Sequence, residues 1–102
     1  MDTVQQKIAE MVKSSPVVVF MKGTPDMPQC GFSKAVMDIF SKLGVAINTV
    51  DVLSDPEIRE GIKQLTQWPT IPQVFIKGEF VGGCDIIREL YSKGELQKMV
   101  VA

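Results

Sequence analysis

The chain has 102 residues, of which 45% are hydrophobic and 23% are charged, and its formal net charge is −1. This size and balance predict one soluble globular domain over residues 1–102, with a single modest core. The low net charge and the absence of a basic run argue against nucleic-acid and membrane partners. The longest apolar run, Val17–Met21, is far too short to cross a bilayer.

The N-terminus and the rare residue types narrow the class further. We expect a cytoplasmic protein, because the sequence shows neither a signal-peptide nor a transit-peptide pattern, although a processed organellar protein would look the same. Histidine is absent, which excludes Cys–His and Ser–His catalysis and His-bound metal. With only two cysteines, Cys30 and Cys84, one chain cannot supply the four ligands of a structural zinc or iron–sulfur site.

The first predicted elements are a helix and a buried strand. Thr3 and Gln6 form a capping-box pair, and apolar residues follow at helical spacing, so we predict a helix over residues 3–14 that Pro16 stops. The run Val17–Met21 is continuously apolar and β-prone, which predicts a strand buried on both faces.

A loop, a helix and a second strand should follow. Residues 23–29 are rich in Gly and Pro and predict a loop. A helix should then begin at about Cys30 and end at Gly44, with an inner face that carries Val36, Ile39, Phe40 and Leu43. Residues 46–52 predict the second strand.

The C-terminal half predicts a helix, a hairpin and a last helix. Asp55 is a typical N-cap with Pro at the first helical position, and one face of the helix carries Ile58, Ile62 and Leu65. Residues 73–76 and 79–81 predict two strands joined by a tight hairpin. A helix opened by Asp85 as N-cap should end at Gly94, with its inner residues Ile86, Ile87, Leu90 and Tyr91.

The order of these elements predicts the fold class. A crossover unit followed by a hairpin implies an α/β protein with a four-stranded mixed sheet and helices on both faces. This is the order of the thioredoxin-like fold.

The segment Cys30-Gly31-Phe32-Ser33 carries one thiol where a Cys-x-x-Cys pair would carry two. Cys30 stands where a helix begins, so N–H groups and the helix dipole should favour its thiolate, and Lys22 could add a positive charge. An inert buried cysteine is the plainer alternative. We expect the Ser33 hydroxyl to satisfy an N–H group of the first turn. The chemistry of Cys30 must then be completed by a sulfur or a metal from elsewhere.

Three segments, Lys22–Ser33, Trp68–Gln73 and Gly82–Asp85, resemble the monothiol glutaredoxins of the Cys-Gly-Phe-Ser type in sequence, order and spacing. The resemblance covers nearly the whole chain. It implies a cis peptide bond before Pro72 that turns the backbone of Ile71 toward the thiol, where an extended peptide could pair with it.

The resemblance also implies that Arg59, by sequence alone a solvated charge, binds a carboxylate of glutathione, with Lys63 assisting. The glycine-rich start of the last helix independently predicts a carboxylate site. Two roles remain open for Trp68, which could form a wall of the groove or serve only in packing. Two also remain open for Cys84, which could be a small buried hydrophobic residue or a second redox sulfur. The predicted glutathione-binding set is Lys22, Arg59, Thr70, Ile71, Pro72, Gly83, Cys84 and Asp85.

These observations predict a carrier of iron–sulfur clusters. Cys30 and one bound glutathione supply two thiolates, so two copies of the chain supply the four that commonly hold a [2Fe–2S] cluster. We therefore expect a homodimer when the cluster is bound, a monomer without it, and client or assembly proteins of iron–sulfur biogenesis as partners.

Two other readings compete with the carrier. In the first, the chain is a glutathione-dependent thiol–disulfide oxidoreductase that uses Cys30 as nucleophile to deglutathionylate proteins. In the second, it is a redox-inert interaction module, which would leave the predicted glutathione-binding residues without a purpose.

Overall fold

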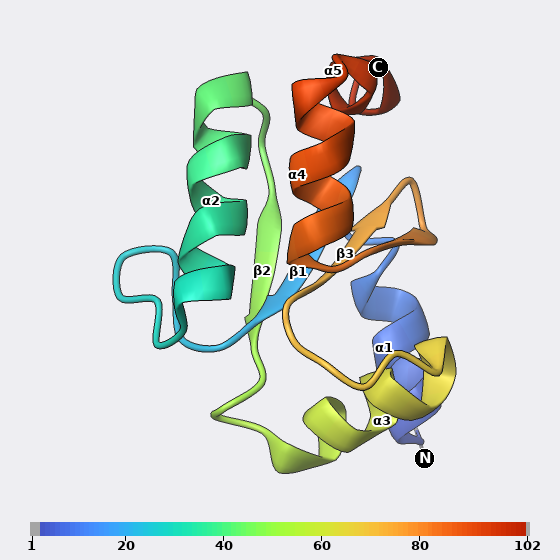
Figure 1. Ribbon diagram of the computed structural model, residues 1–102. Helices are drawn as coiled ribbons and strands as arrows, with labels where there is room; N and C mark the ends of the chain where they lie inside the picture. Colours follow the sequence, from blue (N-terminus) through green and yellow to red (C-terminus); the bar gives the residue numbers. More distant parts are fainter. Residues whose placement is uncertain (1–2, 102) are drawn as a thin grey trace.

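The computed structural model describes residues 3–101, in which α1 and α3 cover one face of a four-stranded sheet and α2, α4 and α5 the other (Figure 1). The strands lie in the order β2-β1-β3-β4; β1 and β2 are parallel and the other pairs antiparallel. The elements are α1 (Val4–Met11), β1 (Val17–Met21), α2 (Gly31–Leu43), β2 (Asn48–Asp51), α3 (Pro56–Thr66), β3 (Gln73–Ile76), β4 (Glu79–Gly82), α4 (Cys84–Ser92) and α5 (Glu95–Met99). The predicted α/β class with a mixed sheet between helices is confirmed. No helix within residues 3–101 is long and apolar enough to span a bilayer.

Alternation along β1 divides the core into two clusters. Val17, Val19 and Met21 face the cluster under α2, α4 and α5, whereas Val18 and Phe20 face the cluster under α1 and α3. All five residues of β1 are buried, which confirms the predicted strand. Each such burial stabilises the fold by about 1.5–3 kcal/mol. The end of β1 is therefore a firm anchor for the segment that follows it.

Helix α1 ends earlier than the sequence predicted. The capping box at Thr3 is present, but the helix ends at Met11. The N–H groups of Lys13 and Ser14 donate to carbonyls only three residues back, so the chain tightens into turns. Pro16 then keeps the chain from resuming the helix, because it disfavours helical geometry in Ser15.

Strand β2 is also shorter than the predicted 46–52. It lies at the edge of the sheet and has only β1 as partner. The pairing runs from Val18–Asn48 to Met21–Asp51. The ladder with β1, rather than the apolar pattern, sets the limits of this strand.

Helix α3 begins after the predicted Asp55 cap, but Leu65 does not share its buried face. Ile58 and Ile62 are buried, whereas Leu65 is 50% exposed. The next inward position is Thr66, whose hydroxyl hydrogen-bonds within the protein. A polar contact has taken the place that the apolar pattern assigned to leucine.

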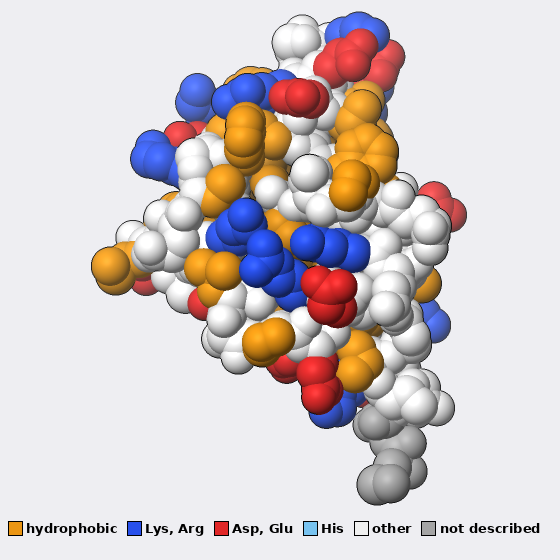
Figure 2. Space-filling view, turned by 60° about the horizontal axis from the view of Figure 1, so that its bottom comes forward, with side chains coloured by type: hydrophobic (Ala, Val, Ile, Leu, Met, Phe, Trp, Pro, Cys, Tyr) orange, Lys and Arg blue, Asp and Glu red, His pale blue; other side chains and the backbone are white. Residues whose placement is uncertain are grey.

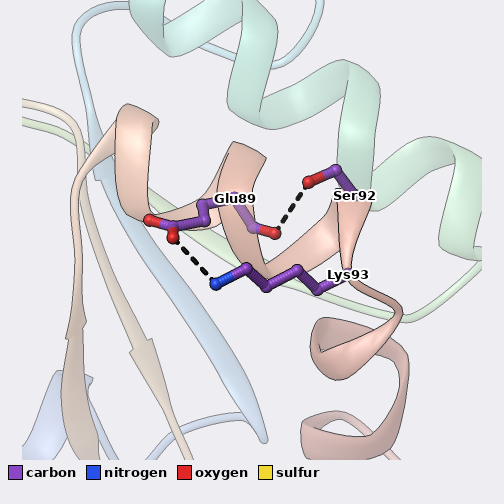
Figure 3. A network of polar contacts seen from close by, with 3 residues as sticks. All are labelled: Glu89, Ser92 and Lys93. Carbon is purple, nitrogen blue, oxygen red and sulfur yellow. Dashed lines mark hydrogen bonds and ion pairs between the residues drawn. The ribbon is translucent and has the colours of Figure 1, made fainter.

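Helix α4 ends in exposed polar contacts. Lys93 Nζ donates to Glu89 Oε1 at 2.9 Å, and Ser92 Oγ donates to the Glu89 carbonyl at 2.9 Å (Figure 3). Both charged side chains are more than half exposed, so the ion pair contributes at most about 1 kcal/mol.

Helix α5 was not predicted from the sequence. It follows Gly94, which takes a left-handed conformation with φ 74°, and its residue Leu96 is fully buried against α4 and the sheet. The spacing of Leu96, Met99 and Val100 was the signal that could have revealed it.

Candidate active site

A groove of about 470 Å³ opens at the N-terminal ends of α2 and α4, between α3 and the segment that joins α3 to β3. This volume suits a small ligand. The groove residues include Lys63 and Trp68 and all nine predicted site residues, Lys22, Cys30, Arg59, Thr70, Ile71, Pro72, Gly83, Cys84 and Asp85. The fold thus brings the predicted set together, while binding of glutathione by these residues stays a prediction.

Cys30 is the N-cap residue of α2 and is half-buried. The pKa of its thiol is held below the ordinary value, chiefly by the backbone N–H of Ser33, against an opposing effect of burial. The N–H of Phe32, the charge of Lys22 and the Ser33 hydroxyl also lower this pKa. The Cys30 side chain accepts no capping hydrogen bond that meets standard geometric criteria. The neighbouring N–H groups and positive charge still favour the thiolate electrostatically. An accessible thiolate is both nucleophile and metal ligand.

Ser33 has a different role from the one predicted. It is completely buried, and its Oγ accepts a hydrogen bond from the backbone N–H of Lys22 at 3.2 Å. The donor therefore comes from the end of β1 rather than from the first turn of α2. Ser33 ties the strand to the helix beside the thiol.

Cys84 is buried at the first position of α4, and the pKa of its thiol is raised by desolvation. Gly83 is the N-cap of this helix, because its carbonyl accepts the N–H of Ile87. The prediction of Asp85 as N-cap is therefore wrong; it lies in the first turn. Arg88 lowers the Cys84 pKa and Asp85 raises it, but burial is the larger effect.

Positive charge gathers on the groove. Among the residues that the structure describes, Lys22, Arg59 and Lys63 line it together with one carboxylate, Asp85. Lys and Arg side chains lie together near the centre of the face shown in Figure 2, with hydrophobic side chains around them. The Arg59 Nε atom is buried and has no hydrogen-bond partner within residues 3–101. A buried donor without a partner favours binding of an anion.

One wall of the groove is the segment that leads into β3. The Ile71–Pro72 bond is cis, as the resemblance implied. The ring of Trp68 packs edge-on against Phe80, with 5.9 Å between the two ring centroids. A Cβ atom at Gly83 would lie 3.1 Å from the indole nitrogen of Trp68. Both open readings of Trp68 therefore hold, since it packs on β4 and lines the groove. Glycine at position 83 therefore lets the wall and α4 approach closely, since a side chain there would have to displace the indole or the Pro72 carbonyl by a few tenths of an ångström.

The sequence reasoning missed three groove residues and two supports. Phe32, Pro69 and Ile86 also line the groove. Asp51 Oδ1 accepts the N–H groups of Gly23 and Leu53 at 2.9 Å and so fixes the start of the loop before Cys30. Gln73 is a fully buried polar residue behind the wall. An acid at the end of one strand and an amide at the start of another were the available signals.

Comparison with known proteins places this site in a family. The sequence model of the family described as Glutaredoxin matches residues 17–81. The chain belongs to the glutaredoxin family. A Synechocystis protein named "Uncharacterized monothiol glutaredoxin ycf64-like" is 57% identical over 92% of this chain and 88% of its own length. "Monothiol glutaredoxin-5, mitochondrial" of Lachancea kluyveri is 48% identical over 94% of this chain and 69% of its own.

The fold agrees with solved structures of the family. The crystal structure of a buckwheat glutaredoxin–glutathione complex has a TM-score of 0.86 and 33% identity, and covers 95% of this chain and 86% of that one. With Ser33 in place of a second thiol, the chain is a monothiol glutaredoxin, and its fold is thioredoxin-like, as predicted.

Proposed function

We propose that this monothiol glutaredoxin binds glutathione in the groove, with the glutathione thiol beside Cys30. Glutathione carries two carboxylates, one ammonium group and two peptide links. Arg59 and the N–H groups at the start of α4 suit the carboxylates, Asp85 suits the ammonium group, and the backbone of Ile71 suits a peptide link. The observation that carries this proposal is the opening of a thiol with a lowered pKa into a cation-lined groove. The buckwheat structure, by its title, contains glutathione.

The proposed cargo is a [2Fe–2S] cluster shared by two copies of the chain. Within residues 3–101 no group of three or more His, Cys, Asp and Glu side chains could hold a metal ion, so other ligands must come from outside the chain. Cys30 fits as one ligand, and the thiol of bound glutathione as a second; two such half-sites make four. Cys84 fits poorly because it is buried and its pKa is raised. Ligands that can leave suit delivery to client or assembly proteins.

Reconstitution tests both parts of the proposal. The protein is incubated anaerobically with iron, sulfide and glutathione, and its visible absorption and its mass are measured together. We expect cluster absorption only in a species with the mass of a dimer, and a return to monomer when the cluster is removed. Cluster formation of the same extent without glutathione, or in a monomer, would contradict the proposal.

The lowered pKa of Cys30 also favours a second candidate, deglutathionylation of proteins. The Cys30 thiolate attacks the glutathione sulfur of a mixed disulfide; a Cys30–glutathione disulfide forms and the protein leaves as a thiolate. A second glutathione thiolate then displaces Cys30 and yields oxidised glutathione. Turnover of a glutathionylated protein at the rate of a dithiol glutaredoxin would favour this candidate over the carrier.

The proposed compartment is the cytoplasm. The name of the Lachancea kluyveri relative assigns that protein to mitochondria, so relatives of this chain do work in organelles. Fractionation of the source cells with an antibody to this chain tests the compartment directly.

A further inference from the structure

Gln73 is a fully buried polar side chain behind the groove wall, and its amide hydrogen-bonds the wall through Nε2 and the last residue of α3 through Oε1. Its Nε2 donates to the carbonyls of Trp68 at 2.9 Å and Thr70 at 3.1 Å, and its Oε1 lies 2.9 Å from Thr66 Oγ1. Carbonyls only accept, so the nitrogen must face them and the amide orientation is fixed. The Gln73 backbone is itself held in the sheet by pairing with Phe20.

Thr66 completes the network from the end of α3. Its Oγ1 accepts the N–H of Trp68 at 3.1 Å and lies 3.0 Å from the Ile62 carbonyl. The single hydroxyl proton is thus shared between that carbonyl and the amide oxygen of Gln73. Both ends of the segment 66–70 are thus hydrogen-bonded to the side chain of Gln73, which belongs to the central strand β3.

This arrangement decides where the wall lies. The carbonyls of Trp68 and Thr70 face Gln73, while both residues line the groove. The wall residues are exposed and carry no other backbone hydrogen bonds outside regular elements within residues 3–101. Besides this network, the wall is held by the packing of the Trp68 ring against Phe80. Gln73 does not line the groove, so it acts through the wall rather than on a ligand.

We propose that Gln73 and Thr66 are positioning residues that hold the Trp68–Thr70 wall in the form that binds glutathione. The proposal rests on the proposed glutathione site. Without the network the wall samples other positions, and affinity falls in proportion to the population of the competent form. A wall that is in place one-tenth of the time lowers glutathione affinity about tenfold.

Trp68 is the only tryptophan, so its fluorescence reports the wall directly. The variants are Gln73→Met, which keeps the length of the side chain, and Thr66→Val, which keeps its shape; both remove hydrogen bonds. We expect acrylamide quenching of Trp68 and hydrogen exchange of its amide to increase in both, without ligand. Titration with reduced glutathione should show about tenfold weaker affinity. Two variants are used in case one does not fold.

Two controls separate positioning from general stability. Thr66→Ser keeps the hydroxyl and should behave as the native protein. Ile76→Val, in the same strand but away from the groove, should lower stability without changing the quenching of Trp68. Unchanged quenching and exchange in Gln73→Met and Thr66→Val would overturn the proposal, as would a loosened wall with unchanged glutathione affinity. Native protein that binds no glutathione while the variants still loosen the wall would refute the proposed function and leave the holding of the wall established.

Discussion

The two cysteines of this chain lie at the starts of two neighbouring helices and line the same groove, yet their thiol pKa values are shifted in opposite directions. Cys30 is the half-buried N-cap of α2 and its pKa is lowered, whereas Cys84 is the buried first residue of α4 and its pKa is raised. Both cysteines therefore lie at the N-terminus of a helix. The helix dipole alone therefore does not make a reactive thiol.

The difference comes from solvation and from the nearest donors. Cys30 faces the N–H groups of Ser33 and Phe32 and the charge of Lys22, which outweigh its partial burial. For Cys84, burial outweighs the attraction of Arg88, and the carboxylate of Asp85 adds to the effect of burial. We therefore expect Cys30 to be the reactive sulfur and Cys84 to serve mainly as a core residue that also lines the groove.

Replacing each cysteine in turn should reveal the largest difference between Cys30 and Cys84. Cys30→Ser should abolish cluster binding, because no other accessible thiolate is available in the described chain, while Cys84→Ser should largely keep it. The measurement is cluster absorption after reconstitution with glutathione. Equal loss in both variants would argue that two copies of each cysteine, rather than glutathione, hold the cluster.

Arg59→Ala distinguishes a cation proposed to bind glutathione from Lys22, which lowers the pKa of the Cys30 thiol. Arg59 is not among the groups that shift the Cys30 pKa, whereas Lys22 is. Loss of one charge-assisted hydrogen bond should weaken glutathione binding by about 1.5–3 kcal/mol, less where solvent screens it, or about tenfold to a hundredfold.

The pH profile of Cys30 alkylation serves as the internal control for Arg59→Ala and should not move. In the proposed dimer two glutathiones hold each cluster, so the amount of loaded dimer at limiting glutathione should fall more steeply than the affinity for a single glutathione. An unchanged glutathione requirement would remove Arg59 from the site.

A third thiol would sharpen the contrast further. Ser33→Cys places a sulfur one helical turn from Cys30 and should raise thiol–disulfide exchange about tenfold, because resolution becomes intramolecular. The substitution also replaces the hydroxyl that binds Lys22 N–H, so about 1 kcal/mol of stability should be lost. Deglutathionylation turnover is the measurement, with Ser33→Ala as the control that loses the hydroxyl without gaining a thiol. Equal turnover in Ser33→Cys and Ser33→Ala would show that the buried position cannot resolve a disulfide.

The sequence predicted features that depend on near neighbours and missed those that depend on distant ones. The buried strand β1, the Asp55 cap and the convergence of motif residues on one groove follow from local pattern and from the family resemblance. The prediction of Asp85 as N-cap was wrong because α4 begins two residues earlier, with Gly83 as its N-cap and no side-chain capping hydrogen bond. The exposure of Leu65 was missed because the inward place is used by the bond between Thr66 and Gln73. The partner of Ser33 lies in another element and could not be read from spacing.

The pH dependence of alkylation tests the comparison with the smallest expected effect. The protein Cys84→Ser keeps only Cys30, and Cys30→Ser keeps only Cys84. A free thiol titrates at about pH 8.5. The lowered pKa of Cys30 means that its thiolate persists as pH falls, so its reaction with iodoacetamide should have a midpoint below that of a free cysteine in the same assay. The raised pKa of Cys84 means that its thiolate forms only at higher pH, which places its midpoint above that of the free cysteine. Midpoints rather than rates are compared, because burial slows Cys84 at every pH. If the two midpoints coincide, or if their order is reversed, then the donors around Cys30 do not control its reactivity and the contrast between the two helix starts is lost.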